Sequence, residues 1–178
     1  MKKILSLFQR NHDGDRLVRD EVVPGAEWVI AGEGVATRKY DGTCCMVKDG
    51  VLWKRYTLKR GKTPPDGFAP ATEVDPVTGK QEGWVKVGDD PGSKYHREAF
   101  DGEEDGTYEL CGPKVQGNPE GFARHLLIPH GRDIKSDAPR NYASLRGYLD
   151  GGGIEGIVWH HPDGRMVKIK AKDFGVSR

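Results

Sequence analysis

Long apolar runs, aromatic residues and net charge are all scarce in this sequence. Apolar residues make up 35% and aromatic residues 8% of the 178 residues, and the mean hydropathy is -0.68. No segment could span a bilayer, and the apolar run near the N-terminus is too short for a signal peptide. We therefore expect a soluble, intracellular protein of the cytoplasm, with no membrane partner and no obligate protein partner.

Opposite charges almost cancel, with 28 Lys and Arg residues against 27 Asp and Glu residues and a net charge of +1. This balance excludes an overall positive field that would attract nucleic acid. Any site for phosphate groups must therefore be local.

Cysteine is also rare, and its three residues are Cys44, Cys45 and Cys111. Neighbours in sequence such as Cys44 and Cys45 are poorly placed for a disulfide, and no spacing resembles a zinc motif. We expect all three to be buried in strands, in a reducing compartment.

Glycine and proline are abundant, at 25 and 11 residues, and they favour many short elements joined by turns. Asp137 as N-cap and Pro139 in the first turn predict a helix that ends at Gly151. The predicted class is α+β, with mainly antiparallel β-sheets and flanking helices in one domain over residues 1–178. A short helix is expected over 93–100, a loop over 59–82, an antiparallel meander over 35–56, and strands over 28–31, 35–39, 43–48, 51–56, 84–87, 107–111, 125–129, 154–160 and 165–170.

Lys39 stands at the end of a predicted strand, in the sequence Lys39-Tyr40-Asp41-Gly42. The pattern Lys-x-Asp-Gly is weak by itself, because Asp-Gly is an ordinary turn dipeptide that occurs eight times in this chain. Support for Lys39 must therefore come from other parts of the sequence.

The last two predicted strands supply such support. A turn at Pro162-Asp163-Gly164 sets the register so that Val158 opposes Lys168 and Gly156 opposes Lys170. The two lysines then share one face of the hairpin.

Glu155 precedes Gly156, and strict alternation places its side chain on the opposite face from the two lysines. A kink at Gly156 would bring the carboxylate round to them. A carboxylate and two ammonium groups at one point suit a nucleotide α-phosphate with Mg²⁺, and neighbouring cations favour the neutral, nucleophilic form of a lysine amine. The alternative is a solvated strand face on which Glu155 pairs with one lysine.

Taken in order, these motifs resemble the covalent nucleotidyltransferase superfamily of polynucleotide ligases and mRNA capping enzymes. More closely, the chain resembles the small single-domain ATP-dependent 5′–3′ RNA ligases of vertebrates and some large viruses. The resemblance runs from about residue 28 to the C-terminus and implies an ATP-grasp-like nucleotidyltransferase (adenylation) domain. Its most specific strings are Tyr40-Asp41-Gly42-Thr43-Cys44-Cys45, Gly83-Trp84-Val85, His125-Leu126-Leu127-Ile128-Pro129-His130-Gly131 and Ile154-Glu155-Gly156-Ile157-Val158-Trp159-His160.

The resemblance implies that Lys39 attacks the ATP α-phosphate and carries AMP, and that Asp41 orients the lysine and the metal. It implies that Glu155 engages Mg²⁺, or Mn²⁺ in its place, and that Lys168 and Lys170 stabilise the α-phosphate during transfer. The remaining nucleotide contacts that it implies are Thr37 and Arg38 beside the lysine, Arg55 at phosphate or ribose, Glu109 at the ribose hydroxyls, and His130 and Val158 on the two faces of the base.

The implied function is an ATP-dependent RNA ligase that joins RNA 5′-phosphate and 3′-hydroxyl ends. Two alternatives stay open: transfer of a nucleoside monophosphate onto RNA 5′ ends without sealing, and an inactive RNA- or nucleotide-binding module. Arg38 stands where the family usually has Glu, which leaves the choice between ATP and GTP open. Because only residues 171–178 follow Lys170, we expect no OB domain, which argues against DNA ligases and capping enzymes.

Overall fold

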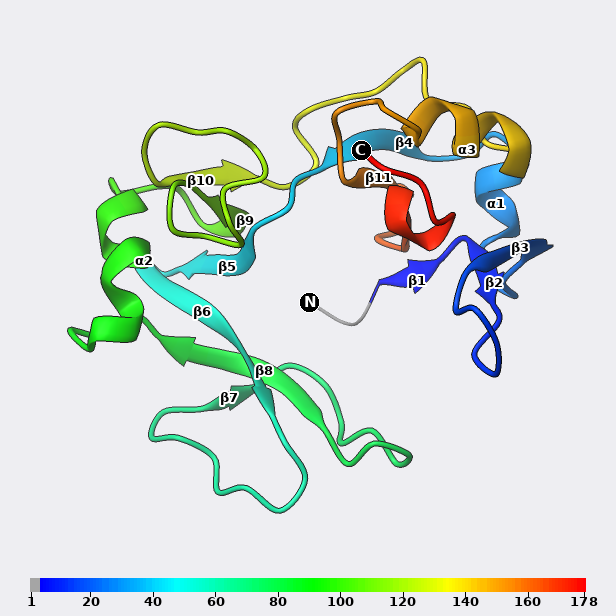
Figure 1. Cartoon of the computed structure of the whole chain (residues 1–178). Coiled ribbons are helices and arrows are strands. Elements are labelled where there is room, and N and C mark those ends of the chain that lie inside the picture. The colour runs from blue at the N-terminus through cyan, green and yellow to red at the C-terminus, as the bar shows by residue number, and fades with distance from the viewer. Residues whose placement is uncertain (1–3) are drawn as a thin grey trace. The chain divides into compact units, whose positions relative to one another are not determined.

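The computed structural model describes residues 4–178, so Met1–Lys3 of the sequence lie outside the described residues (Figure 1). The described chain forms two compact units, one from Asp41–His130 and the other from Ile4–Tyr40 and Gly131–Arg178. The single domain expected over residues 1–178 remains a prediction, and each unit is described by itself. Within residues 4–178, no helix has the length and apolar character needed to cross a membrane.

The unit of residues 41–130 is built on a six-stranded sheet with the order β10-β9-β5-β6-β8-β7, in which every neighbouring pair is antiparallel. One face packs against the short helix α2, whose Ala99 joins the apolar cluster of this unit. Figure 1 shows α2 at the side of β6 and β9. The elements are β5 (Thr43–Lys48), β6 (Val51–Leu58), β7 (Ala69–Pro70), β8 (Gln81–Lys86), η1 (Pro91–Ser93), α2 (Lys94–Ala99), β9 (Gly106–Cys111) and β10 (Leu126–Pro129).

The hairpin of β5 and β6 turns at Asp49 and Gly50, both of which have positive φ angles, 54° and 71°. Two such residues define a type I′ turn, for which Asp-Gly is a preferred sequence. The Asp105 carboxylate accepts hydrogen bonds from the backbone N–H groups of Asp49 and Gly50, at 2.9 and 3.2 Å. The turn is therefore closed by a side chain from the start of β9.

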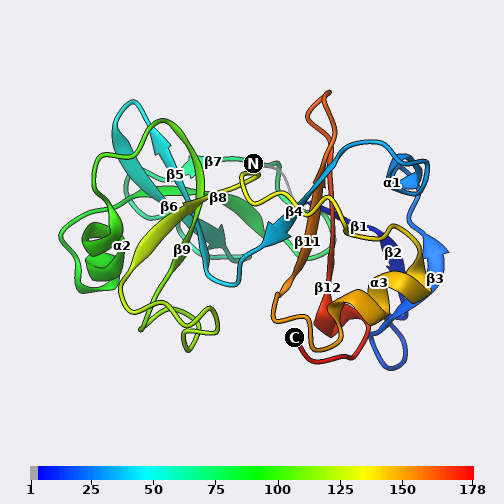
Figure 2. The same cartoon turned by 90° about the horizontal axis from the view of Figure 1, so that it is seen from above.

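The other unit contains a four-stranded sheet with the order β1-β12-β11-β4. β1 runs parallel to β12, and the remaining pairs are antiparallel. Helix α3 packs on the small β2-β3 sheet, where the Tyr142 hydroxyl donates to the Val18 carbonyl at 3.0 Å, and Figure 2 shows α3 beside β3. The elements are β1 (Leu5–Ser6), β2 (Phe8–Arg10), β3 (Val18–Val22), α1 (Glu27–Ile30), β4 (Val35–Lys39), α3 (Tyr142–Leu149), β11 (Gly156–His160), β12 (Met166–Lys170) and η2 (Ala171–Asp173).

Apolar side chains on one face of this sheet form the core of the second unit. Ile157, Trp159 and Ile169 are fully buried and cluster with Leu145 and Leu149 of α3. Because strand side chains alternate between faces, the neighbouring residues of β11 and β12 point to the opposite face. That opposite face carries Lys168 and Lys170.

The predicted α+β class with mainly antiparallel sheets is confirmed, as are most predicted strands. The strand predicted over 28–31 is wrong, because Glu27–Ile30 forms the one-turn helix α1 that buries Trp28 and Val29 and exposes Ile30. A short apolar run does not distinguish a strand from a buried helical turn. The loop predicted over 59–82 contains the two-residue strand β7, and its end pairs as part of β8.

Three further predictions are corrected. The helix expected to start at Asp137 starts at Tyr142, because the Asn141 side chain caps it by accepting from the Ser144 N–H at 2.9 Å. The meander over 35–56 is interrupted, because β4 pairs with β11 whereas β5 pairs with β6 and β9.

Of the cysteines, Cys45 and Cys111 are buried as expected, and Cys44 is only half-buried.

Candidate functional site

The lysines of the second unit lie on one face of the sheet formed by β4, β11 and β12. Gly156 on the central strand β11 is the partner of both Lys39 and Lys170. Val158, two residues further, is the partner of Thr37 and of Lys168. The register predicted for the last hairpin is therefore confirmed, and it places all these residues on one face.

Glu155 lies among the lysine side chains, although it immediately precedes a strand residue of the same face. Its Oε2 is 2.5 Å from Lys39 Nζ, and its Oε1 is 3.9 Å from Lys170 Nζ. A Cβ added to Gly156 would lie 2.1 Å from the Ile169 carbonyl oxygen, so only glycine fits where these strands approach. Strand β11 begins at Gly156, and Glu155 therefore stands outside the regular alternation.

Lys170 is half-buried, and burial lowers the pKa of its ammonium from 10.5 to about 8, with a further contribution from Lys172. Asp173 and Glu155 oppose this shift because each favours the charged amine. An ammonium that is poorly hydrated gains more from contact with a phosphate than a solvated one does. The ammonium groups of Lys39 and Lys170 can therefore bind an anion, and Lys170 can lose its proton at about pH 8.

Thr37 and Arg38 take up different positions beside Lys39. Thr37 is buried, and its hydroxyl donates to the Val158 carbonyl at 3.1 Å. Its oxygen also lies 3.0 Å from His160 Nε2, and since the hydroxyl has one proton, His160 is the donor of that bond. Arg38 alternates to the opposite face from Lys39, and its guanidinium lies 4.5 Å from the centre of the Tyr40 ring.

A network that the sequence did not predict anchors the strand of Lys39. The Tyr40 hydroxyl donates to Asp133 at 2.9 Å, Lys135 pairs with Asp133 at 3.1 Å, and the Arg38 N–H donates to the Asp133 carbonyl at 2.8 Å. Burial raises the pKa of Asp133, but the hydrogen bonds from Lys135 and Tyr40, together with the positive charges of Lys135 and Arg38, bring the pKa below its usual value. No motif pointed to this network because Asp133 lies in a loop far from Lys39 in sequence.

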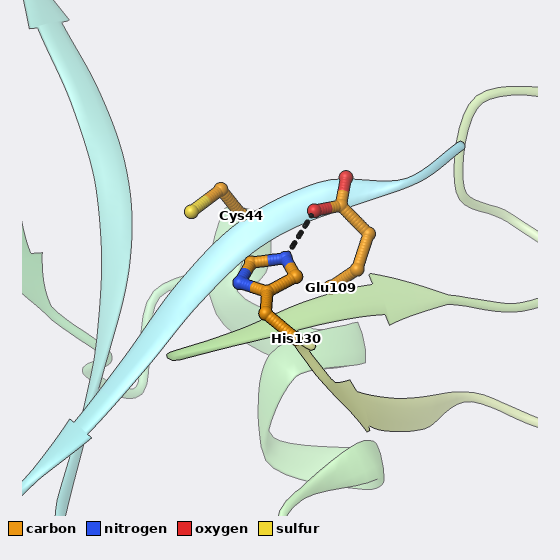
Figure 3. Close-up of side chains that lie close together, drawn as sticks. All are labelled: Cys44, Glu109 and His130. Carbon is orange, nitrogen blue, oxygen red and sulfur yellow. Dashed lines mark hydrogen bonds and ion pairs between the residues drawn. The ribbon is translucent and has the colours of Figure 1, made fainter. Parts of the chain in front are cut away.

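The unit of residues 41–130 carries a second polar cluster on the face of its sheet that is opposite the apolar core. Glu109 on β9 is the cross-strand partner of Cys44 on β5. Its Oε1 accepts from the Gly42 N–H at 3.1 Å, and its Oε2 lies 2.9 Å from His130 Nε2. His130 Nδ1 lies 3.0 Å from the Thr107 hydroxyl. Figure 3 shows Cys44, Glu109 and His130 drawn together from three segments of the chain.

Arg55 on β6 belongs to the same unit, and its guanidinium is already held in place. Its Nε lies 3.1 Å from Glu82 Oε2, and its Cζ lies 5.0 Å from the centre of the Trp84 ring. Both partners come from β8, the strand next to β6. The arginine is thus oriented without a ligand.

Asp41 is the first residue of the unit that carries Glu109, whereas Glu155 belongs to the other unit. The Asp41 backbone N–H donates to Glu120 Oε1 at 2.9 Å, a contact that no sequence motif predicted. The predicted site residues thus form two groups: Thr37, Arg38, Lys39, Glu155, Val158, Lys168 and Lys170 in one unit, and Asp41, Arg55, Glu109 and His130 in the other.

Comparisons with known proteins point to one family. A family model described as RNA ligase 1 matches residues 98–178. The chain is 38% identical over 79 residues to RNA ligase 1 of Pongo abelii, a match covering 39% of this chain and 24% of that protein. It is 26% identical over 219 aligned positions to RNA ligase 1 of Rattus norvegicus, covering 80% of this chain and 67% of that protein.

These matches confirm the resemblance to the RNA ligase family. The range that matches the family model contains Glu109, His130, Glu155, Lys168 and Lys170, and it does not contain Lys39. The rat match covers 80% of this chain. In the Pongo abelii match, by contrast, the chain spans only about a quarter of the relative's length.

Proposed function

We propose that this chain, a relative of proteins named RNA ligase 1, is the nucleotidyltransferase domain of an ATP-dependent RNA ligase. It joins RNA 5′-phosphate and 3′-hydroxyl ends through AMP bound covalently to Lys39. The observation that carries the proposal is the cluster of Lys39, Glu155 and Lys170 at 2.5 and 3.9 Å, on a sheet face that also bears Lys168. A binding module would not need a lysine amine paired with a carboxylate on a sheet face that bears two further lysines.

In the first step Lys39 Nζ attacks the α-phosphorus of ATP. The N–P bond forms as the bond from the α-phosphorus to the bridging oxygen breaks, and pyrophosphate leaves. Glu155, at 2.5 Å from Nζ, is close enough to accept the proton that the amine loses. Lys168 and Lys170 stabilise the negative charge on the α-phosphate oxygens.

The next two steps return the lysine to its free form and seal the RNA. An oxygen of the RNA 5′-phosphate attacks the α-phosphorus, the N–P bond breaks, and Lys39 regains a proton. The RNA 3′-hydroxyl then attacks the 5′-phosphate phosphorus, loses its proton, and displaces AMP. The bond energy of ATP is thereby used to form one phosphodiester.

Mg²⁺ or Mn²⁺ would be held by Glu155, whose carboxylate supplies the oxygen ligands that such cations prefer, while Asp41 stays a metal ligand that only the resemblance implies. Glu155 fits this role because its carboxylate lies on the same sheet face as the lysines that would bind the α-phosphate. When bound, the cation supplies positive charge for the phosphate oxygens. Within the unit of residues 41–130, Glu109 would accept hydrogen bonds from the ribose hydroxyls, with Arg55 at phosphate or ribose and His130 against the base. Val158 of the other unit stays a base contact that only the resemblance implies.

Covalent labelling tests this proposal. The protein is incubated with Mg²⁺ and α-labelled ATP or GTP, denatured, and examined for acid-labile label. We expect labelling of the wild type and none of Lys39→Ala, while Lys94→Ala, which removes an exposed lysine of α2, labels like the wild type. Equal labelling of Lys39→Ala and the wild type would contradict the mechanism. The extent of wild-type labelling with ATP and with GTP shows which base is preferred.

Addition of RNA with a 5′-phosphate and a 3′-hydroxyl separates the enzymatic alternatives. A ligase converts the RNA to a longer or circular product and releases AMP. A protein that only transfers the nucleotide leaves a capped 5′ end with no joined product. That second result would restrict the function to nucleotide transfer.

A further inference from the structure

Cys44, Glu109 and His130 bring three different metal-binding groups to one point of the six-stranded sheet. A thiol sulfur, a carboxylate oxygen and an imidazole nitrogen all lie within 4.8 Å of one another (Figure 3). The cluster follows from the register, because Cys44 and Ile128 are both cross-strand partners of Glu109, and His130 is two residues beyond Ile128. The backbone N–H of His130 continues this pairing by donating to the Thr107 carbonyl at 3.0 Å.

Two of the three side chains are also oriented by a second hydrogen bond. Glu109 Oε1 accepts from the Gly42 N–H, which fixes the carboxylate with Oε2 toward His130 Nε2. His130 Nδ1 contacts the Thr107 hydroxyl at 3.0 Å. In this structure the His130 Nε2–H donates to Glu109, because a carboxylate oxygen only accepts. A cation bound at Nε2 would displace that proton, and the imidazole proton on Nδ1 could then donate to the Thr107 hydroxyl, as in histidines that bind a metal. Hydrogen bonds of this kind typically support metal ligands in proteins.

The donor set selects one class of cation. Mg²⁺ and Ca²⁺ take oxygen ligands, whereas a thiolate and an imidazole favour a softer ion such as Zn²⁺. Zn²⁺ binds such groups at about 2.0–2.3 Å in tetrahedral geometry, so that its ligand atoms lie about 3.5 Å apart. The present separations, from 2.9 Å between Glu109 and His130 to at most 4.8 Å, need only small side-chain movements to meet this geometry.

We propose that Cys44, Glu109 and His130 form a binding site for a thiophilic divalent cation of the Zn²⁺ class. Three protein ligands leave one tetrahedral position open to water or to an anion. The proposal has a second part that rests on the proposed function. The proposed function assigns Glu109 to the ribose and His130 to the base. A bound Zn²⁺ would occupy both side chains and therefore compete with ATP.

Cobalt binding tests the site without any assay of activity. Co²⁺ is titrated into the metal-free full chain, and the thiolate-to-cobalt charge-transfer absorbance is recorded. We expect this band in the wild type, its loss in Cys44→Ser, and its retention in Cys45→Ala, which changes the buried neighbouring cysteine. Absence of the band from the wild type, or its persistence in Cys44→Ser, would overturn the site.

Zinc affinity, measured by competition with a chromogenic chelator, adds a second readout. Cys44→Ser should weaken Zn²⁺ binding at least tenfold, and Thr107→Val should weaken it by about 10- to 100-fold through the orientation of His130. Circular dichroism of each variant establishes that it is folded. Unchanged zinc affinity in a folded Cys44→Ser variant would contradict the assignment.

Competition is tested by nucleotide labelling of Lys39 at increasing Zn²⁺, with each variant normalised to its own rate without zinc. Zn²⁺ should raise the apparent KM for ATP in the wild type, and Cys44→Ser should need at least tenfold more Zn²⁺ for the same rise. A wild type that binds Zn²⁺ with no change in KM would refute the competition. Failure of any labelling would instead refute the proposed function, while the cobalt titration still decides the metal site.

Discussion

Two sheet faces hold their polar groups in different ways. The lysine face of the four-stranded sheet bears Lys39, Lys168 and Lys170, and the Glu109 face of the six-stranded sheet bears Cys44 and Glu109. On the first, charges balance one another, since Glu155 lies between Lys39 and Lys170. On the second, Glu109 is fixed by a backbone N–H and by His130, with no lysine or arginine bonded to it among the described contacts. The first arrangement suits a charged phosphate and the second suits hydroxyl donors.

Both faces nevertheless use glycine in the same way. A Cβ at Gly156 would lie 2.1 Å from the Ile169 carbonyl oxygen, and one at Gly42 would lie 2.1 Å from the Leu110 carbonyl oxygen. Each glycine adjoins a residue that is central to the proposed site, Glu155 in one case and Asp41 in the other. Close approach of backbones, rather than a positive φ angle, is what requires glycine at these positions.

The largest effect is expected from removal of a cation on the lysine face. Lys170→Ala should slow covalent labelling by about 10²–10³-fold, because it removes a half-buried positive charge that stabilises the transferring phosphate. Single-turnover labelling at saturating ATP measures this rate. The matched control is Lys94→Ala, whose amine is exposed on α2. A labelling rate of Lys170→Ala within threefold of the wild-type rate would show that this lysine does not stabilise the transferring phosphate.

Substitution of the glycine beside Glu155 should affect stability strongly. Gly156→Ala is expected to destabilise the fold by about 3 kcal/mol, because the new methyl group collides with the backbone of β12. Gly147→Ala in α3 is the control, since nothing lies within 4 Å of its added Cβ, and it should stabilise by about 0.5–1 kcal/mol. Urea denaturation measures both, and an unchanged midpoint for Gly156→Ala would contradict the close approach.

Substitution on the Glu109 face should act on binding more than on rate. Glu109→Ala is expected to raise the KM for ATP by about 10- to 100-fold, because hydrogen bonds to a charged group contribute about 1.5–3 kcal/mol. The rate at saturating ATP should fall much less than in Lys170→Ala. Steady-state labelling over a range of ATP concentrations separates the two parameters. A loss confined to the rate would remove the distinction between the faces.

The smallest effect concerns pH. Burial lowers the pKa of Lys170 to about 8, so its ammonium is charged below that pH and neutral above it. Attraction for phosphate is therefore present at pH 7.5 and is lost as the pH rises, and the Kd for ATP should increase roughly tenfold by pH 9. Lys170→Arg, which stays charged, should give a flatter profile. Calorimetric titrations measure both, and parallel profiles would exclude Lys170 as the titrating group.

The sequence predicted the lysine face better than the Glu109 face, and the reason is distance along the chain. Glu155, Lys168 and Lys170 belong to one hairpin whose turn sets the register, so their juxtaposition could be derived locally. Cys44, Glu109 and His130 come from separate segments, and only the pairing of β9 with both β5 and β10 brings them together. No zinc motif was expected because such motifs depend on close spacing in sequence.

Other differences have similar causes. Trp28 and Val29 gave no periodic pattern that would separate a helical turn from a strand, and tertiary burial decided the outcome. Asp137 is an acceptable N-cap by residue type, but Asn141 makes the capping bond. Arg38 was predicted to contact the nucleotide because it directly precedes Lys39. Strand alternation instead directs its side chain away from Lys39 and over Tyr40.

The central claim is that Lys39 carries the nucleotide, and peptide mapping tests it most directly. The protein is incubated with ATP and Mg²⁺, digested at a pH that preserves the N–P bond, and analysed by tandem mass spectrometry. We predict an AMP adduct on the Lys39 side chain and no adduct in Lys39→Ala. An adduct on a different residue, or none on a folded wild-type protein, would contradict the proposed mechanism.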